Sequence, residues 1–176
     1  MSFQTAAPFS SIVKILEIDD LSNFPNGFDI TDLNPDAFQK FEYVFDRVQT
    51  DKDARSDDLR FRVSEDNGAT FLSDSSAYFV QFVHNNDSSE QSSINAGIIG
   101  TDGSFGDTKR SVMGSFANLK TPSTGSIDTF NLLSVSDGSI VNARLSVNTL
   151  GDINAVQFFA DASLVNGSFV LWGYKW

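Results

Sequence analysis

The stretch Leu59–Glu65 reads LRFRVSE, and it shows the pattern that decides the fold. Its first five residues alternate between apolar and charged side chains, so one face of a strand would be apolar and the other polar. The stretch Phe41–Val48, FEYVFDRV, repeats this period of two residues, with aromatic rings at positions 41, 43 and 45. Both stretches predict half-buried β-strands, because neither follows the 3.6-residue period of a helix.

Further segments outward from these two are also rich in β-branched and aromatic residues, and Asp, Asn, Gly and Ser clusters separate them. They cover residues 77–84, 94–100, 111–119, 129–135, 140–147, 155–162 and 168–176. This arrangement predicts an all-β protein, an antiparallel two-sheet β-sandwich of jelly-roll type with ten or eleven short strands. At most one or two helical turns are expected, with residues 31–40 as one candidate. The run Ile12–Ile18, IVKILEI, fits either a strand or a short helix.

The composition limits the classes of function that this protein can have. The 176 residues contain no cysteine, which excludes disulfides and thiolate catalysis, and the formal net charge is −11. This charge argues against binding to nucleic acid. No apolar run approaches the roughly 18 residues of a membrane span, and no signal peptide is recognisable. We expect an N-terminal arm and first strand in residues 1–27 and the sandwich domain in residues 28–176.

Three polar segments are expected to be loops. Residues 85–93 and 100–110 are predicted to be exposed connections. The segment Asp51–Asp58 carries the densest group of carboxylates, which are the ligands that Ca²⁺ prefers. Its metal-ligand candidates are Asp51, Asp53, Asp57 and Asp58. Because Lys52 and Arg55 neutralise part of this charge, the alternative is a solvated hairpin loop between strands 41–48 and 59–65. No cofactor other than Ca²⁺ is suggested.

The segment after strand 59–64 contains a turn that resembles an Asp-box. The matching residues are Ser64, Asp66, Gly68, Thr70 and Phe71. Asn67-Gly68 suits the positive φ of a tight turn, and the carboxylate of Asp66 can accept hydrogen bonds from the backbone of the turn. The motif occurs once, so we interpret it as a structural hairpin turn, with contact to a ligand as the alternative.

No catalytic arrangement stands out, and the protein is predicted not to be an enzyme. His84 is the only histidine, and it ends an apolar strand. The C-terminal strand is more informative, because alternation places Trp172, Tyr174 and Trp176 on one face. These rings can belong to the core, to a subunit interface or to a platform on which sugars stack.

Three segments together resemble a β-sandwich module of tailed-bacteriophage virion proteins. Residues 41–45 with Leu59–Phe71 look like its "Y-x-x-x-F … L-x-x-R-x-S-x-D-G-G" pattern. Residues 155–159, AVQFF, match its penultimate strand, and Asn166–Gly173, NGSFVLWG, looks like its closing "G-x-I-x-L-Y-G" strand. The resemblance covers residues 28–176. Asn67 replaces the first Gly of the turn and Trp172 replaces Tyr, so the match is at the level of the family.

The resemblance implies a structural protein exposed on the virion surface and assembled in the host cytoplasm. A tail-fibre knob, receptor-binding or adaptor protein is its first implication, and a capsid decoration (cement) protein is the alternative. It implies a homotrimer that contacts other virion proteins, and it transfers no catalytic residues. A hypothesis of another class is a lectin or glycan hydrolase domain acting on host surface glycans. That hypothesis rests on the aromatic C-terminal strand, the acidic loop and the Asp-box-like turn.

Overall fold

A computed structural model of the protein describes residues 11–51, 59–73, 78–84, 87–92, 97–100, 110–117, 119–120, 127–136, 139–147 and 151–175. These residues contain twelve strands and one 3-10 turn, η1 (Leu21–Asn23). The strands are β1 (Ile12–Ile18), β2 (Phe28–Ile30), β3 (Phe38–Thr50), β4 (Leu59–Ser64), β5 (Tyr78–His84), β6 (Asp87–Ser92), β7 (Gly97–Gly100), β8 (Arg110–Ala117), β9 (Ile127–Ser136), β10 (Ser139–Val147), β11 (Ala155–Ala160) and β12 (Leu164–Lys175).

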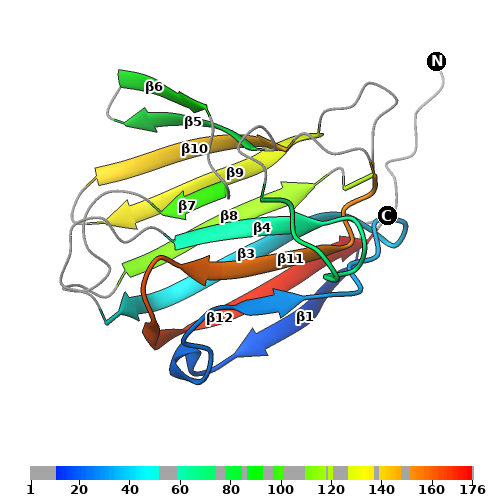
Figure 1. The fold of residues 1–176 in the computed structure, drawn as a ribbon, viewed down its shortest axis with the longest axis horizontal. Helices are drawn as coiled ribbons and strands as arrows, with labels where there is room; N and C mark the ends of the chain where they lie inside the picture. The colour runs from blue at the N-terminus through cyan, green and yellow to red at the C-terminus, as the bar shows by residue number, and fades with distance from the viewer. Residues whose placement is uncertain are drawn as a thin grey trace, which may run out of the picture.

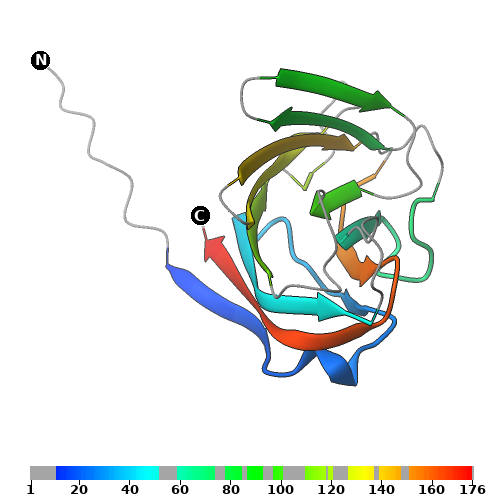
Figure 2. The same cartoon turned by 90° about the vertical axis from the view of Figure 1, so that its left-hand side faces the viewer.

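The strands form two sheets, and adjacent strands in both run antiparallel (Figure 1). The large sheet has eight strands in the order β1-β12-β3-β8-β9-β10-β5-β6, and the small sheet has four in the order β2-β11-β4-β7. Figure 2 shows that the large sheet curves around the small one, so that its concave face encloses the core. The predicted all-β, two-sheet sandwich is therefore confirmed.

Aromatic rings from both sheets fill the space between them. Phe158 of β11 lies 5.3 Å from Phe169 of β12, 5.4 Å from Phe45 of β3 and 5.7 Å from Phe28 of β2, measured between ring centroids. Phe45, Phe158 and Phe169 are completely buried. Each buried ring removes apolar surface worth roughly 2–3 kcal/mol, and favourable ring pairs add about 1 kcal/mol.

One of the predicted hairpins is wrong. Strands β3 and β4 were expected to pair across the acidic loop, but β3 pairs with β12 and β8, whereas β4 pairs with β11 and β7. The turn after β4 does fold back on that strand, because the Leu72 N–H donates a hydrogen bond to the Val63 carbonyl at 2.9 Å, and the chain then continues to β5 of the large sheet. Both connections thus cross from one sheet to the other. Alternation marks a buried face on each strand, but it does not say which neighbouring strand supplies the hydrogen bonds.

Residues Ile12–Ile18, open between strand and helix in the sequence, form β1 and pair with β12. The polar segment 85–93, expected to be a loop, contains β6, which pairs with β5 at the edge of the large sheet. Backbone hydrogen bonds suffice for such a strand, and polar side chains are typical of sheet edges. Residues 35–37 form a turn, and the 3-10 helix lies at η1 instead. The proposed boundary between residues 27 and 28 stays a prediction.

Two buried tyrosines differ in how their hydroxyl groups are satisfied. The hydroxyl of Tyr78, on β5, accepts a hydrogen bond from the Val63 N–H at 3.0 Å and donates one to the Leu72 carbonyl at 2.9 Å. It therefore ties the large sheet to β4 of the small sheet, and burial raises its pKa to about 12. The hydroxyl of Tyr43 is buried with no hydrogen-bond partner among the described residues, and burial raises its pKa.

This difference gives a matched pair of variants. In Tyr78→Phe the Val63 N–H loses its partner, and we expect the free energy of unfolding to fall by about 1–3 kcal/mol. In Tyr43→Phe a buried hydroxyl that has no partner among the described residues is removed, and we expect the free energy of unfolding to be unchanged or to rise by about 1 kcal/mol. Urea denaturation of both variants and the wild type measures these changes in the free energy of unfolding. Equal destabilisation by the two substitutions would contradict the assignment.

Candidate functional site

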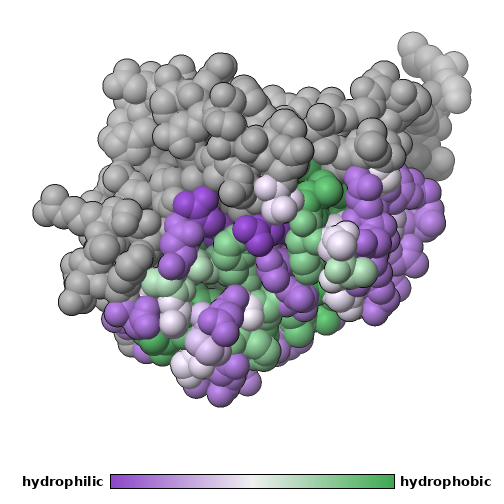
Figure 3. Space-filling model, viewed as in Figure 1, coloured by the Kyte–Doolittle hydropathy of each residue, from purple (hydrophilic) through white to green (hydrophobic). Residues whose placement is uncertain are grey.

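The outer face of the small sheet is covered by polar side chains that pair with one another. Arg60 lies 2.8 Å from the carboxylate of Asp161, and Gln157 donates a hydrogen bond to Asp29 at 2.9 Å. The guanidinium of Arg62 lies over the Phe159 ring, 4.8 Å from its centroid. Figure 3, which views this side of the molecule, shows hydrophilic surface interrupted by strips of hydrophobic surface.

The convex outer face of the large sheet carries a different set of side chains. Phe169 and Leu171 of β12 are completely buried, so alternation directs Trp172 and Tyr174 to the opposite, outer face, where both are half-buried. In the strand register Trp172 lies between Lys14 of β1 and Glu42 of β3. We call Lys14, Lys40, Glu42, Trp172 and Tyr174 the outer-face cluster.

Three members of this cluster form a connected polar network. The hydroxyl of Tyr174 donates a hydrogen bond to the carboxylate of Glu42, and the Lys40 ammonium pairs with the other oxygen of that carboxylate. The Lys40 ammonium also lies 5.4 Å from the centroid of the Tyr174 ring. Partial burial acts to raise the pKa of Glu42, but the hydrogen bonds from Lys40 and Tyr174 outweigh it and lower the pKa. The hydrogen bond to Glu42 raises the pKa of Tyr174.

The outer-face cluster contains two of the three aromatic residues singled out in the sequence. Trp172 and Tyr174 are half-buried on the outer face and so do not belong to the core, and their roles as an interface or a sugar platform stay predictions. Trp176 lies outside the described residues. Lys14, Lys40 and Glu42 were not predicted, although Lys40 and Glu42 follow the even-numbered, outward period of β3. Their contacts with β12 depend on long-range strand pairing, since Tyr174 and Glu42 are 132 positions apart in the chain.

A second feature is a polar cleft of about 380 Å³ beside two adjacent strand irregularities. In β3, Arg47 has φ +50°, and in β12, Gly167 has φ +116°. A Cβ atom at Gly167 would lie 2.7 Å from the Cα of Val48, so only glycine fits there. Bulges of this kind re-aim side chains and are frequent beside binding sites.

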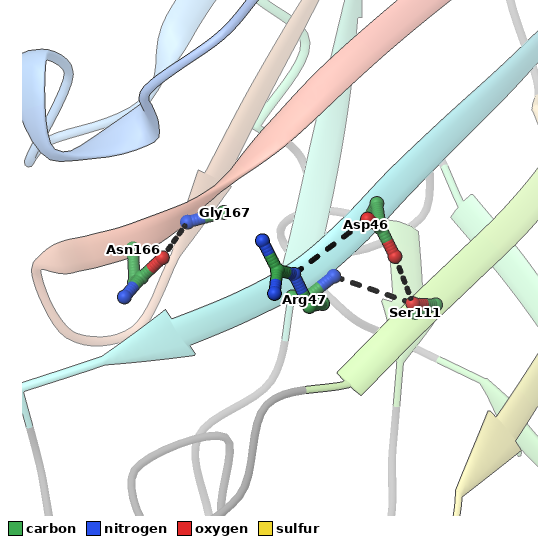
Figure 4. A network of polar contacts seen from close by, with 5 residues as sticks. All are labelled: Asp46, Arg47, Ser111, Asn166 and Gly167. Carbon is green, nitrogen blue, oxygen red and sulfur yellow. Dashed lines mark hydrogen bonds and ion pairs between the residues drawn. The ribbon is translucent and has the colours of Figure 1, made fainter.

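Hydrogen bonds hold the side chains at these bulges (Figure 4). The Ser111 hydroxyl donates to Asp46 at 2.7 Å and accepts from the Arg47 N–H at 3.2 Å. The side-chain oxygen of Asn166 accepts from the Gly167 N–H at 2.8 Å. Hydrogen bonds from Ser22 lower the pKa of Asp20, the next carboxylate along the cleft.

Three carboxylates, those of Asp19, Asp20 and Asp46, line the cleft together with one cation, Arg47. Asp19 and Asp20 also line an adjoining groove of about 440 Å³, where the Phe24 side chain is 38% exposed. Carboxylates beside an exposed ring can accept hydrogen bonds from the hydroxyl groups of a polyol. Sequence reasoning missed this site, because its residues come from β3, β8, β12 and the connection after β1. The one sequence signal for the site was the Asn166-Gly167 pair inside a strand, because glycine within a strand often marks a bulge.

The Asp-box-like turn forms a closed hydrogen-bond network. Asn67 and Gly68 have φ +57° and +88°. Asp66 accepts from the Ser64 hydroxyl at 2.6 Å and from the Thr70 N–H at 2.8 Å. The Ser64 hydroxyl oxygen in turn accepts from the Gly68 N–H at 2.9 Å. These bonds lower the pKa of Asp66 to about 2, with the side chains of Ser64 and Thr70 as the main cause.

Distant residues fasten this turn to the sheets. The Asn67 N–H donates to the side chain of Asn154 at 2.7 Å, and the Asp32 N–H donates to that of Asn67 at 2.6 Å. Phe71 is half-buried, and its ring lies 3.7 Å from where a Cβ on Gly68 would be. These contacts are internal, so the geometry agrees with a structural role for the turn.

The calcium candidates are only partly described. The carboxylate of Asp51 accepts a hydrogen bond from the Ser163 N–H at 3.0 Å, whereas Asp53, Asp57 and Asp58 lie outside the described residues. In the described segments, no group of three or more His, Cys, Asp or Glu residues is arranged to hold a metal ion. The same segments contain no helix long and apolar enough to cross a membrane. Calcium binding stays a prediction.

No protein-family model and no curated protein matches the sequence. Among solved structures, the chain is similar to CG-16, a homodimeric agglutinin from chicken liver, with 12% identity and a TM-score of 0.34 over 81% of this chain and 98% of that one. The CBM40 of Ruminococcus gnavus IT-sialidase, bound to α2,3 sialyllactose, has 9% identity and a TM-score of 0.37 over 93% and 92%. The CBM2 module of the evolved Dit of Lactobacillus casei BL23 phage J-1 has 9% identity and a TM-score of 0.30, over 84% of this chain and 69% of that one. Values this low carry no argument about function.

The lowered pKa of Asp66 predicts a pH-dependent contribution of the turn to stability. Because its pKa falls from 3.8 to about 2 on folding, the charged carboxylate stabilises the fold fully above pH 3.8. This contribution is lost as the pH falls towards 2. Asp66→Asn should lower the urea midpoint at pH 6, and the difference from wild type should shrink between pH 4 and pH 2.

The control is Asp161→Asn, which removes a surface carboxylate outside the turn. Its urea midpoint is measured at the same pH values, so that an effect common to any Asp→Asn substitution is separated from one specific to the turn. A difference between Asp66→Asn and wild type that stays constant down to pH 2 would contradict the role given to the Asp66 carboxylate.

Proposed function

We propose that this protein acts by binding rather than by catalysis, and that the outer-face cluster is a platform for a surface glycan. The observation that carries the proposal is the position of Trp172. Its indole is half-buried on an outward face between Lys14 and Glu42, beside the Tyr174–Glu42–Lys40 network. An aromatic face stacks on the C–H face of a sugar ring, and the charged neighbours can bond its hydroxyl groups.

The rigidity of this platform supports binding. Trp172 and Tyr174 lie on a strand whose other face is packed against the core through Phe169 and Leu171. The Glu42 carboxylate is fixed by two donors from neighbouring positions. Groups that are already ordered lose little conformational entropy when a ligand binds, which favours affinity.

The carboxyl groups support a non-catalytic role. Among the described carboxyl groups, those with a shifted pKa are Asp20, Glu42 and Asp66, and hydrogen bonds lower the pKa of each. A glycan hydrolase needs one carboxyl group with a raised pKa to protonate the leaving oxygen. None of these three groups has that property, so we propose recognition rather than hydrolysis as the form of the glycan hypothesis.

The wider setting that we propose is a virion surface, as a tail-fibre or receptor-binding knob. The support is the sequence resemblance carried by Leu59–Phe71 and Asn166–Gly173, which lie in and beside β4 and β12. A capsid decoration protein is the alternative within this setting. Immunogold labelling of intact particles separates the two, since a knob places gold on the tail and a decoration protein places it on the capsid. Gold on neither structure would contradict the setting.

Trp172→Ala is the direct test of the platform. On a glycan array, wild-type protein should bind at least one class of glycan, and Trp172→Ala should weaken this binding by about tenfold or more, equivalent to ~1.4 kcal/mol. The physical reason is the loss of the stacking surface, while the core face of β12 is unchanged. The dissociation constant for the best array ligand would then be measured by isothermal titration calorimetry.

The chain offers two matched controls. Phe159→Ala removes a half-buried ring from the outer face of the small sheet, and it should leave glycan binding intact. Asp46→Ala alters the polar cleft and should also leave binding intact. Loss of binding in Asp46→Ala but not in Trp172→Ala would move the site to the cleft, and no array binding by the wild type would contradict glycan recognition.

A further inference from the structure

Among the described residues, the outer edge of strand β1 pairs with no other strand. This strand is the first in the sheet order, and its only described neighbour is β12. Figure 1 shows it along the border of the sheet, at the opposite end from β6. The backbone groups on the outer side of such a strand can form hydrogen bonds with another strand. Unlike β6, β1 is rich in apolar residues: its seven residues read IVKILEI.

The sequence of β1 is complementary to itself when read in the opposite direction. An antiparallel pair with a two-fold axis between Ile15 and Leu16 places each Lys14 opposite Glu17 of the other copy. It also places Val13 opposite Ile18, and Ile15 opposite Leu16. Opposite charges and pairs of apolar residues at facing positions stabilise antiparallel strands. Every facing pair within residues 13–18 is therefore favourable in this one register.

The bulge in β1 makes this match geometrically workable. In a regular strand, residues three positions apart point to opposite faces of the sheet. The register of β1 against β12 shifts between Lys14 and Leu16, and the ion pair between Lys14 and Glu17 shows that both side chains reach the same face. Their side chains are 54% and 46% exposed. Both charges are thus available to a partner strand on one surface.

From these observations we infer that β1 pairs with β1 of a second copy of this chain. The partner strand runs antiparallel, and Lys14 and Glu17 exchange their partner within the chain for one in the other copy. The pairing is isologous, so it closes as a dimer. It joins the two eight-stranded sheets edge to edge. This inference rests on the β1 edge alone and does not depend on the glycan proposal.

Two opposing terms set the strength of this dimer. Two strands of seven residues bury less than the roughly 1,200–2,000 Å² of a standard interface, so a dissociation constant in the micromolar range is expected. The net charge of −11 on each chain also opposes association, and salt screens this repulsion over about 8 Å at physiological ionic strength. The measurement therefore belongs at physiological salt, where the close charge pairs persist better than the distant repulsion.

The dimer would have one consequence for the outer-face cluster. Trp172 lies on the strand next to β1, so the two Trp172 side chains would be separated by three strand spacings across the joined sheet, roughly 14 Å, and displaced along the strands by the separation of Lys14 from Glu17. Both would face the same side of the joined sheet. One extended glycan could then contact both copies, which raises the overall affinity through effective concentration.

Charge reversal tests the register as well as the dimer. Lys14→Glu and Glu17→Lys each place like charges opposite each other at both symmetric contacts, and each should weaken dimerisation by about tenfold or more. The double variant Lys14→Glu/Glu17→Lys restores both pairs and should dimerise like the wild type. Sedimentation equilibrium of the full chain over a concentration series measures the constants, and circular dichroism checks that each variant folds.

Mixing the two single variants gives the sharpest outcome. In a heterodimer of Lys14→Glu with Glu17→Lys, each facing pair again combines one acid with one base, so native mass spectrometry should show the mixed dimer above either homodimer. Wild-type protein that stays monomeric or forms trimers would overturn the inference. Single variants that dimerise as tightly as the wild type would overturn it too, as would a mixture without heterodimer enrichment.

Discussion

The contacts of Phe158 are the constraint on which the rest of the molecule depends. Its ring, on the small sheet, lies among Phe28, Tyr43, Phe45 and Phe169, and so it joins β2 and β11 to β3 and β12 of the large sheet. A second contact between the sheets is a hydrogen bond, which the Tyr78 hydroxyl of β5 accepts from the Val63 N–H of β4. Together these contacts hold the two sheets against each other and determine which faces of β3, β11 and β12 are turned inward.

The inward alternation has a direct consequence for the outer surface. Once Phe169 and Leu171 are committed to the core, Trp172 and Tyr174 must lie outside, next to Glu42 and Lys40 of β3. Where the alternation is interrupted, at Arg47 and Gly167, the backbone opens a polar cleft. Regular strands thus produce a rigid aromatic surface, and bulges produce a concave acidic one. The two differ in chemistry, since only the first combines an indole with a network of donors and acceptors.

The edges of the large sheet show the same division of roles. The sheet ends at β6, DSSEQS, on one side and at β1, IVKILEI, on the other. A polar edge discourages further pairing, whereas an apolar edge with one cation and one anion at symmetric positions favours a second copy of itself. The surface beside β1 is also the surface that carries Trp172. Binding to a glycan and self-association would therefore act on one continuous face.

The sequence by itself determined the strands and their faces. Alternation in Leu59–Glu65 and Phe41–Val48 located β4 and the centre of β3, and it placed Trp172 and Tyr174 on one face of the last strand. Alternation is a local property, so it could not assign strands to sheets: β3 and β4 were expected to pair, yet they lie in different sheets. It also missed β6, because backbone hydrogen bonds to β5 stabilise that strand without an apolar pattern. Only the tertiary structure brought Lys40 and Glu42 beside Tyr174, and Asp46 beside Ser111, because those contacts require long-range strand register and backbone bulges that no short stretch of sequence encodes.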